Sequence, residues 1–212
     1  MMAEDIKPNR LERSKQAISR LIDKLKGDRI GLIVFAGEPY VQLPITTDYS
    51  AAKLFLSTIN TNIIPTQGTE IGKAIDLSIK SFDLENAQNK AIIIITDGEN
   101  HDQKAIESTK KAQELGIFVH TLGMGLSKGA PIPIYNKYNN RIGYRKDKEG
   151  NTIVSKLNEN LLQDIALEGK GTYVRANNSK AGLSILFTEI NKMEKKEIGT
   201  MVFTEYKDRF QF

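Results

Sequence analysis

Residues 91–100, AIIIITDGEN, constrain the fold more than any other stretch of this sequence. Five apolar residues, four of them isoleucine, run without a polar break and stop at Thr96, Asp97 and Gly98. Such a β-branched run is typical of a strand covered on both faces in a parallel sheet. Asp97 then follows the carboxyl end of the strand, the edge at which open α/β sheets bind ligands. The alternative is that Asp97 and Gly98 only form a turn, since this pair is common in turns.

Segments with strand and helix patterns alternate along most of the chain. Strands are predicted at 29–36, 41–46, 91–96, 117–122 and 172–175, and helices at 8–26, 48–59, 69–79, 102–115, 158–169 and 179–193. Only four residues separate the first two strands, so we expect an antiparallel hairpin there. The order predicts an α/β fold, a doubly wound and mostly parallel sheet with one antiparallel edge strand and helices on both faces.

Helical spacing also predicts which side chains of the second helix are buried. We expect that the helix at 48–59, capped by Thr47 or Asp48, turns four apolar side chains inward. These are Ala51, Leu54, Phe55 and Ile59.

Composition excludes several classes of site. Because the chain has no cysteine and only two histidines, it can hold neither a disulfide framework, a thiolate metal site nor a multi-histidine zinc site. No stretch approaches the roughly 20 apolar residues of a membrane span. The chain has a net charge of +4, and its excess of basic residues is concentrated in one segment. Residues 126–156 carry seven Lys or Arg against two Asp or Glu. We predict a solvated surface hairpin there; Tyr135, Tyr138 and Tyr144 leave open a nucleic-acid surface.

Thr69 and Asp97 are the residues with the clearest potential for chemistry. Thr69 stands where a helix begins, and taken alone it is predicted to be an N-cap. Its helix leads into the strand that ends at Asp97, so both residues are expected on one rim of the sheet. A hydroxyl and a carboxylate suit a hard divalent cation such as Mg²⁺ or Mn²⁺, although two ligands are fewer than the six such a cation prefers. We expect His120 to be a packed core histidine and His101 to lie on a loop.

Several motifs together resemble a von Willebrand factor A domain. They are the hairpin RIGLIVFAG…VQLPITTD, the loop QGTEIGKAI, the strand IIIITDGEN and the later GIFVHTLGMG. More narrowly, PNRLERSKQAI, TDGENHD and GAPIP resemble the Bat family, the BatA/BatB aerotolerance-type membrane proteins.

The resemblance implies a Rossmann-like fold with a metal-ion-dependent adhesion site at the carboxyl edge of the sheet. By motif, Thr69 and Asp97 match the family's metal ligands, and the implied ion is Mg²⁺ or Mn²⁺, with Ca²⁺ as a further option. The residues expected around the ion or facing a partner are Gly68, Glu70, Gly98, Glu99 and His101.

The family's first motif, Asp-x-Ser-x-Ser, ends a strand that precedes the first helix, and the sequence from Met1 onward does not contain it. We therefore expect a missing first strand and weak or absent metal binding by this fragment. That strand belongs between the strands at 29–36 and 91–96. These two strands could pair directly, residues 1–7 could fill the space, or a second copy could insert its residues 200–206 and form a homodimer.

The resemblance implies a binding module and not an enzyme. Its cation would be shared with an acidic side chain of a protein partner, with other Bat proteins and a MoxR-type ATPase as candidates and no nucleic acid. Residues 1–195 would form the domain, with a surface excursion at 126–156, and residues 196–212 a tail toward a membrane segment. The fragment is expected to be soluble and its parent anchored in the inner membrane, with this domain on the periplasmic side and a role in aerotolerance or envelope stress.

Two other functions fit the sequence less well. One is a structural scaffold with a vestigial metal site. The other is a Mg²⁺-dependent hydrolase using Asp97, Glu99 and Asp102. A hydrolase of this kind needs a positioned nucleophile or a second metal, and the sequence shows neither.

Overall fold

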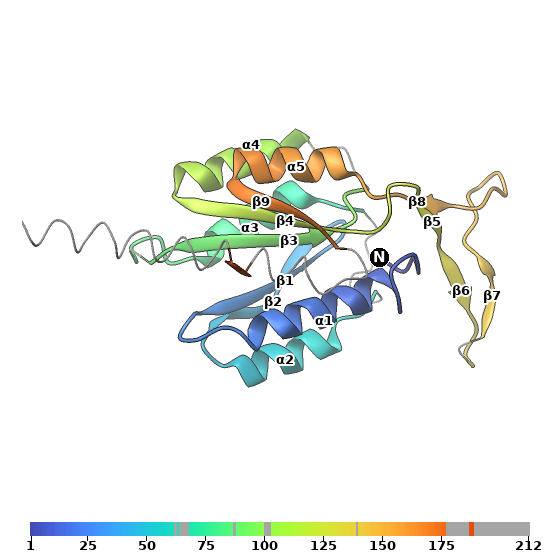
Figure 1. Ribbon diagram of the computed structural model, residues 1–212, viewed down its shortest axis with the longest axis horizontal. Coiled ribbons are helices and arrows are strands. Elements are labelled where there is room, and N and C mark those ends of the chain that lie inside the picture. The colour runs from blue at the N-terminus through green and yellow to red at the C-terminus, as the bar shows by residue number, and fades with distance from the viewer. Residues whose placement is uncertain are drawn as a thin grey trace, which may run out of the picture.

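The computed structural model describes residues 1–61, 63, 68–86, 88–99, 103–138, 140–176 and 187–188 (Figure 1). In chain order its elements are α1 (Arg10–Ile22), β1 (Ile30–Phe35), β2 (Pro39–Thr46), α2 (Tyr49–Thr58), α3 (Ile71–Ser81), β3 (Lys90–Thr96), α4 (Gln103–Glu114), β4 (Ile117–Met124), β5 (Ala130–Pro131), β6 (Pro133–Tyr135), β7 (Arg141–Tyr144), β8 (Val154–Ser155), α5 (Glu159–Glu168) and β9 (Lys170–Ala176).

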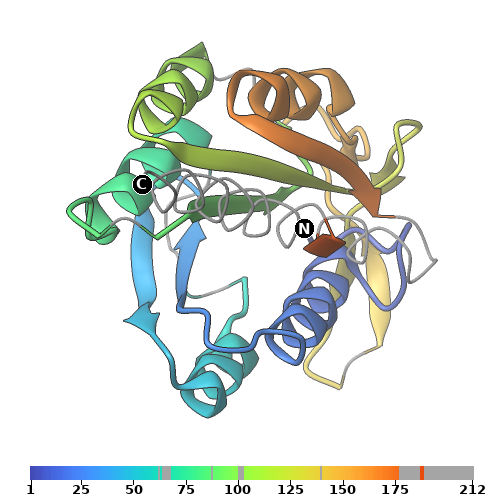
Figure 2. The same ribbon diagram turned by 60° about the vertical axis from the view of Figure 1, so that its left-hand side comes forward.

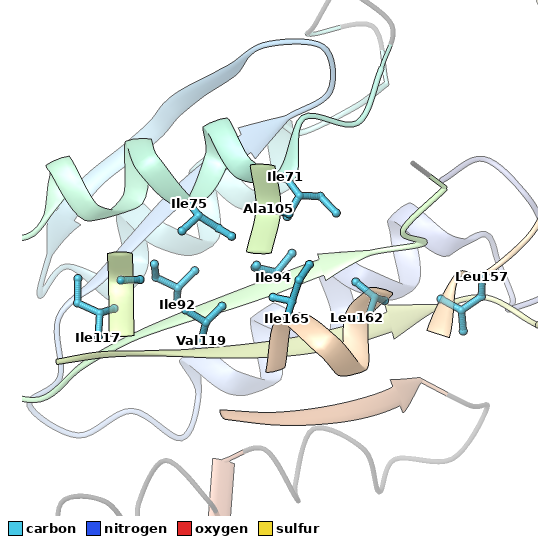
Figure 3. Close-up of a cluster of buried hydrophobic side chains, with 11 residues drawn as sticks. Ile71, Ile75, Ile92, Ile94, Ala105, Ile117, Val119, Leu157, Leu162 and Ile165 are labelled. Atoms are coloured by element: carbon cyan, nitrogen blue, oxygen red, sulfur yellow. The ribbon is translucent and has the colours of Figure 1, made fainter. Parts of the chain in front are cut away.

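The predicted parallel sheet is formed by β3, β4 and β9, in that order. Helices α4 and α5 lie over one face of it (Figure 1), and α3 packs against α4. Between them the helices and β3 and β4 bury one apolar cluster, shown in Figure 3, to which β3 contributes Ile92 and Ile94. The isoleucine-rich run is therefore a strand of the parallel sheet, as predicted, but only one of its faces, with Ile92 and Ile94, is buried. Ile93 and Ile95 on the other face are partly buried.

The antiparallel hairpin is also confirmed. Strand β1 pairs with β2 in a register that places Ile33 opposite Val41 and Phe35 opposite Pro39. Helices α1 and α2 pack together beside this hairpin, on the other side of the molecule from α4 and α5 (Figure 1). A second apolar cluster, which includes Leu32 and Leu56, lies between them.

The central position of the sheet is open in the part of the chain that the structure describes. There β1 pairs only with β2, and β3 pairs only with β4, so the two strands do not pair with each other. A cleft of about 1170 Å³ lies between them and is lined by residues of both strands. Figure 2 shows the hairpin of β1 and β2, in blue, apart from the sheet that contains β3. Direct pairing of these strands is thus excluded, and residues 1–7 form no strand. Strand exchange with a second copy stays a prediction.

Two helices differ from the sequence prediction. Helix α1 ends at Ile22, with Asp23 as its C-cap, four residues earlier than expected. In α2, capped by Asp48 as predicted, the buried side chains are Ala52 and Leu56. Leu54 is 64% exposed and Phe55 40% exposed, so their predicted burial is wrong. The run Leu54-Phe55-Leu56 is apolar on every side, so periodicity could not fix which face of this short helix packs.

The predicted surface excursion leaves the sheet after β4. It contains two short antiparallel pairs, β5 with β8 and β6 with β7. The predicted helix at 179–193 lies outside the described residues except for Phe187 and Thr188, as do the expected strand at 200–206 and tail at 196–212. Within the described ranges, no helix has both the length and the apolar character that a membrane crossing requires.

Candidate functional site

Asp97 lies directly after β3, at the carboxyl edge of the sheet, and is 4% exposed. Its backbone oxygen accepts a hydrogen bond from the Asn158 N–H at 3.0 Å, which fixes it against the start of α5. Gly98 follows with a φ of +64°, and its N–H donates to Thr96 Oγ1 at 3.2 Å. Residues 97–99 form neither a turn nor a bend, so the Asp-Gly turn alternative is not supported. Gly98, in its left-handed conformation, leads the chain away from the strand while the Asp97 carboxylate stays at the sheet edge.

The Asp97 carboxylate is in contact with two cationic groups. Its Oδ2 accepts hydrogen bonds from the Met1 ammonium group at 3.0 Å and from Arg10 Nη1 at 3.1 Å. The Arg10 side chain is fully buried and comes from the first turn of α1. A nearly buried carboxylate so placed is stabilised by positive charge close to it. This position therefore favours a cation.

Arg10 connects Asp97 to the base of the surface excursion. Its Nε and Nη2 donate to the two carboxylate oxygens of Asp5 at 2.8 and 2.9 Å, and Nη2 also donates to the Ser155 carbonyl at 3.0 Å. Nη1 makes a further contact with Ser155 Oγ. Asp5 Oδ2 in turn accepts the Leu126 N–H at 2.7 Å. One guanidinium thus joins α1, the end of β3 and both ends of the excursion.

Asp5 has a lowered pKa as a result of this network. Burial raises the pKa of its carboxyl group, but the Arg10 hydrogen bonds, the Leu126 N–H and the charge of Arg10 outweigh burial. Sequence reasoning missed both Asp5 and Arg10, because an arginine in the first turn of an amphipathic helix resembles a solvent-facing residue. The only signal was its place within PNRLE, which the Bat-family resemblance included.

Thr69 lies in the loop that precedes α3. The N-cap of that helix is Glu70, which makes no side-chain capping bond, so the predicted N-cap role of Thr69 is wrong. The Glu70 N–H donates instead to the Ala36 carbonyl at 2.9 Å and ties this loop to the end of β1. Thr69 and Gly68 line the same cleft as Asp97 and Glu99. The structure thus places Thr69 and Asp97 around one cleft, while their role as metal ligands stays a prediction.

The other candidate residues have separate environments. Glu99 Oε1 accepts the Lys156 N–H at 3.2 Å. Glu70 lies 3.9 Å from the Lys73 ammonium. His120 is buried, and its Nδ1 accepts the Thr172 N–H at 3.0 Å, a structural role as predicted. His101 and Asp102 lie outside the described residues.

The residues present supply part of a metal shell. The Asp97 carboxylate and the Thr69 hydroxyl are the oxygen ligands that Mg²⁺ and Mn²⁺ use, and the two cationic groups beside Asp97 show that positive charge fits there. Across the described ranges, however, no group of three or more His, Cys, Asp or Glu side chains is arranged to hold a metal ion. Further ligands would have to complete the shell.

A doubly wound α/β domain with a cation-favouring carboxylate at its carboxyl edge is the class that the fold and site define. The chain belongs to the von Willebrand factor type A domain family, whose model matches residues 3–189. The predicted family and fold are therefore confirmed.

Among solved structures, two Bat-type proteins are similar to this chain over most of its length. BatB from Bacteroides thetaiotaomicron is 50% identical, with a TM-score of 0.87, over 92% of this chain and 93% of that one. An aerotolerance-related membrane protein from Bacteroides fragilis is 47% identical, with a TM-score of 0.85, over 91% and 93% of the two chains. A mussel byssus protein, proximal thread matrix protein 1, has zinc in its metal-ion-dependent adhesion motif. It is 16% identical with a TM-score of 0.62, over 91% of this chain and 43% of that one, and shares the fold alone.

The Bat-type homologues thus share both the fold and about half of the sequence. The chain spans 36% and 16% of the lengths of two curated relatives, with which it is 30% and 42% identical over the matched segments.

Proposed function

We propose that this domain is a metal-assisted protein-recognition module of a Bat-type membrane-anchored protein, and not an enzyme. The observation that carries the proposal is the Asp97 carboxylate, which lies at the carboxyl edge of the sheet, in the cleft that Thr69 also lines, with the Arg10 guanidinium on one of its oxygens. A divalent cation bound there, Mg²⁺, Mn²⁺ or Ca²⁺, would present a free coordination position to an acidic side chain of the partner.

The Bat-type homologues, one of which is an aerotolerance-related membrane protein, support a proposal for the physiological setting. We place this domain on the periplasmic side of the inner membrane, where it acts in aerotolerance or envelope stress. Its candidate partners are other Bat proteins and a MoxR-type ATPase. These assignments extend the recognition role and do not change the chemistry expected at Asp97.

The two ion pairs of Asp97 predict that metal binding by the present chain is weak. Arg10 and the Met1 ammonium group already stabilise Oδ2, so a cation must compete with them or use the other oxygen. Ligand number sets affinity as well, and the family's two serine ligands are not in this sequence. Calorimetry with Mg²⁺ and Mn²⁺ should show no binding at micromolar levels, and a tight one-to-one isotherm would contradict this reasoning.

A longer chain, in which an Asp-x-Ser-x-Ser strand precedes Met1, provides the decisive comparison. Immobilised, it should retain a second Bat protein in Mg²⁺ and release it in EDTA. Asp97→Asn should abolish retention in Mg²⁺ because it removes the charged ligand and keeps the side-chain shape. Glu114→Gln, at the exposed end of α4 and away from the candidate site, is the control that should leave retention unchanged. Retention by Asp97→Asn at the wild-type level would refute the proposal.

The ion pair between Arg10 and Asp97 favours a second candidate function, a structural scaffold whose metal site is vestigial. In that case Asp97 serves the fold alone, as an anion that balances a buried arginine. The scaffold predicts that Asp97→Asn lowers the free energy of unfolding while Mg²⁺ changes neither the stability nor the partner binding of the longer chain. Recognition through the metal predicts that Mg²⁺ raises its melting temperature and that Asp97→Asn removes this increase.

A further inference from the structure

The β6–β7 hairpin extends away from the body of the domain, beyond the edge at which β3 and β4 end (Figure 1). The excursion at 126–156 carries seven cationic side chains, all exposed, against two acidic ones, a net charge of +5. Because the whole chain has a net charge of +4, the rest of it has a net charge of −1. The basic character of this protein is therefore confined to one protruding arm. The cations are Lys128, Lys137, Arg141, Arg145, Lys146, Lys148 and Lys156.

The same arm exposes apolar side chains. Of the eleven large hydrophobic residues exposed within the described ranges, five lie between positions 134 and 154, with exposures up to 72%. They are Ile134, Tyr138, Ile142, Tyr144 and Val154. Two cations lie over aromatic rings, Lys137 at 5.1 Å from the centre of the Tyr138 ring and Arg141 at 5.3 Å from that of Tyr144. Exposed tyrosine with arginine is the composition enriched at the centres of protein interfaces.

The base of the arm is fixed while its tip is uncovered. The Arg145 N–H donates to the Ile132 carbonyl, and the Ile153 N–H donates to the Arg145 carbonyl, both at 2.8 Å. The hydroxyl of Tyr135 hydrogen-bonds to the Glu4 carboxylate in front of α1. A two-stranded hairpin without a covered face is marginal on its own in water. This arm therefore presents a surface that gains stability when another chain covers it.

The arm is continuous with the site at Asp97. Ile134, Tyr135 and Arg145 line the same cleft as Asp97 and Thr69. The guanidinium of Arg10 connects the arm to Asp97, because it donates hydrogen bonds both to the Asp97 carboxylate and to the carbonyl of Ser155 in β8. A partner that reaches Asp97 would thus also meet the basic arm.

We propose that the arm at 130–155 binds an acidic protein segment that interleaves carboxylates with aromatic or aliphatic side chains. This inference rests on the proposed recognition of an acidic side chain at Asp97, and it adds the class of sequence around that side chain. Charge complementarity selects an acidic partner, and the exposed apolar side chains select one that carries apolar residues of its own. Lys137 lies over the Tyr138 ring and Arg141 over the Tyr144 ring, so cationic and apolar groups are mixed on this surface, unlike the segregated faces of a membrane-surface helix. The aliphatic Ile134, Ile142 and Val154 have no stacking role toward nucleic-acid bases.

The test uses a fluorescein-labelled 12-residue peptide that alternates glutamate with tyrosine and leucine. Its control is the same peptide with glutamine for glutamate. Fluorescence anisotropy should show binding of the acidic peptide only, weakening as salt rises because exposed charge pairs are screened. Binding of the two peptides with equal affinity would overturn the proposal.

Variants of the protein locate the binding. The triple variant Lys137→Gln, Arg145→Gln, Lys146→Gln should bind the acidic peptide about tenfold more weakly, since each of the three exposed pairs contributes a factor of about 2. The matched control, Lys80→Gln, Lys110→Gln, Lys111→Gln, removes the same charge from α3 and α4 and should bind like wild type. Equal weakening in both variants would mean that net charge, and not the arm, controls binding. Circular dichroism of each variant checks that the fold is kept.

Two further measurements separate this inference from its rivals. If the arm binds anionic phosphatidylglycerol vesicles but not the acidic peptide, the protein-segment proposal is wrong. Peptide binding in EDTA measures the arm alone, and the increase on adding Mg²⁺ to the longer chain measures the site at Asp97. Loss of the Mg²⁺ increase with an intact triple-variant effect counts against the proposed function only. An absent triple-variant effect with an intact Mg²⁺ increase counts against the arm only.

Discussion

Replacement of Arg10 by methionine tests whether its buried network organises the candidate site. The guanidinium is fully buried and donates to Asp5, Asp97 and Ser155. Arg10→Met leaves two nearly buried carboxylates without this partner, and breaking one side of a buried ion pair costs about 3–5 kcal/mol. For a domain of this size each kcal/mol lowers the melting temperature by about 2–4 °C. We therefore expect a decrease of about 6–20 °C, measured by circular dichroism, with urea unfolding at pH 7 giving the free energy.

The pH dependence of this effect identifies its electrostatic origin. The lowered pKa of Asp5 stabilises the wild type above the pKa of the unfolded chain, and this contribution is lost as the pH falls through the folded-state pKa. In Arg10→Met, burial still raises the pKa of Asp5, while the hydrogen bonds and the charge of Arg10, which lower it, are lost. The stability difference should thus be largest at pH 7 and shrink below about pH 4.

Two controls complete this experiment. Arg10→Lys keeps the charge but loses the fork that holds both oxygens of Asp5, so it should recover only part of the stability. Arg10→Met with Asp5→Asn removes one unpaired charge and should be more stable than Arg10→Met alone. An unfolding free energy of Arg10→Met within about 1 kcal/mol of wild type, with no pH dependence, would refute the reasoning.

The remaining predictions concern packing. Leu56→Ala should lower the free energy of unfolding by about 2–5 kcal/mol, because Leu56 is 3% exposed, whereas Leu54→Ala should change it by no more than about 0.5 kcal/mol; equal effects in urea unfolding would contradict the observed face of α2. Gly72→Ala should cost about 1–3 kcal/mol, because a Cβ there would lie 2.9 Å from the Lys104 carbonyl carbon, and thermal unfolding at the wild-type temperature would show that α3 and α4 pack less closely than described.

Much of the fold could be predicted from local patterns. The isoleucine run before Asp97 is apolar throughout and has one plausible use, as a buried parallel strand. Asn158 and Gly169 mark the ends of α5 as expected for a helix cap and stop. Prediction failed at Leu54 and Phe55, where an unbroken apolar run on a short helix leaves the buried face to tertiary packing.

The site was only half accessible to sequence reasoning. Asp97 could be found because its strand is unmistakable and the edge it occupies follows from topology. The partners of its carboxylate could not be found, because Arg10 is 87 positions and Met1 is 96 positions away. Contacts between residues so far apart in the sequence form only when the chain has folded, and they produce no periodic pattern in the sequence.

Paramagnetic broadening by Mn²⁺ in the NMR spectrum of the ¹⁵N-labelled protein tests the central claim most directly, because it locates even a weakly bound ion. At Mn²⁺ concentrations on the order of millimolar, the range of weak oxygen-ligand sites, the amide signals of residues 68–70 and 97–99 should broaden first. Asp97→Asn should abolish that broadening, while Glu114→Gln, at the exposed end of α4, should leave it in place. Broadening that survives Asp97→Asn, or that centres on Asp147 and Glu149 in the excursion, would contradict a cation site at the edge formed by Thr69 and Asp97.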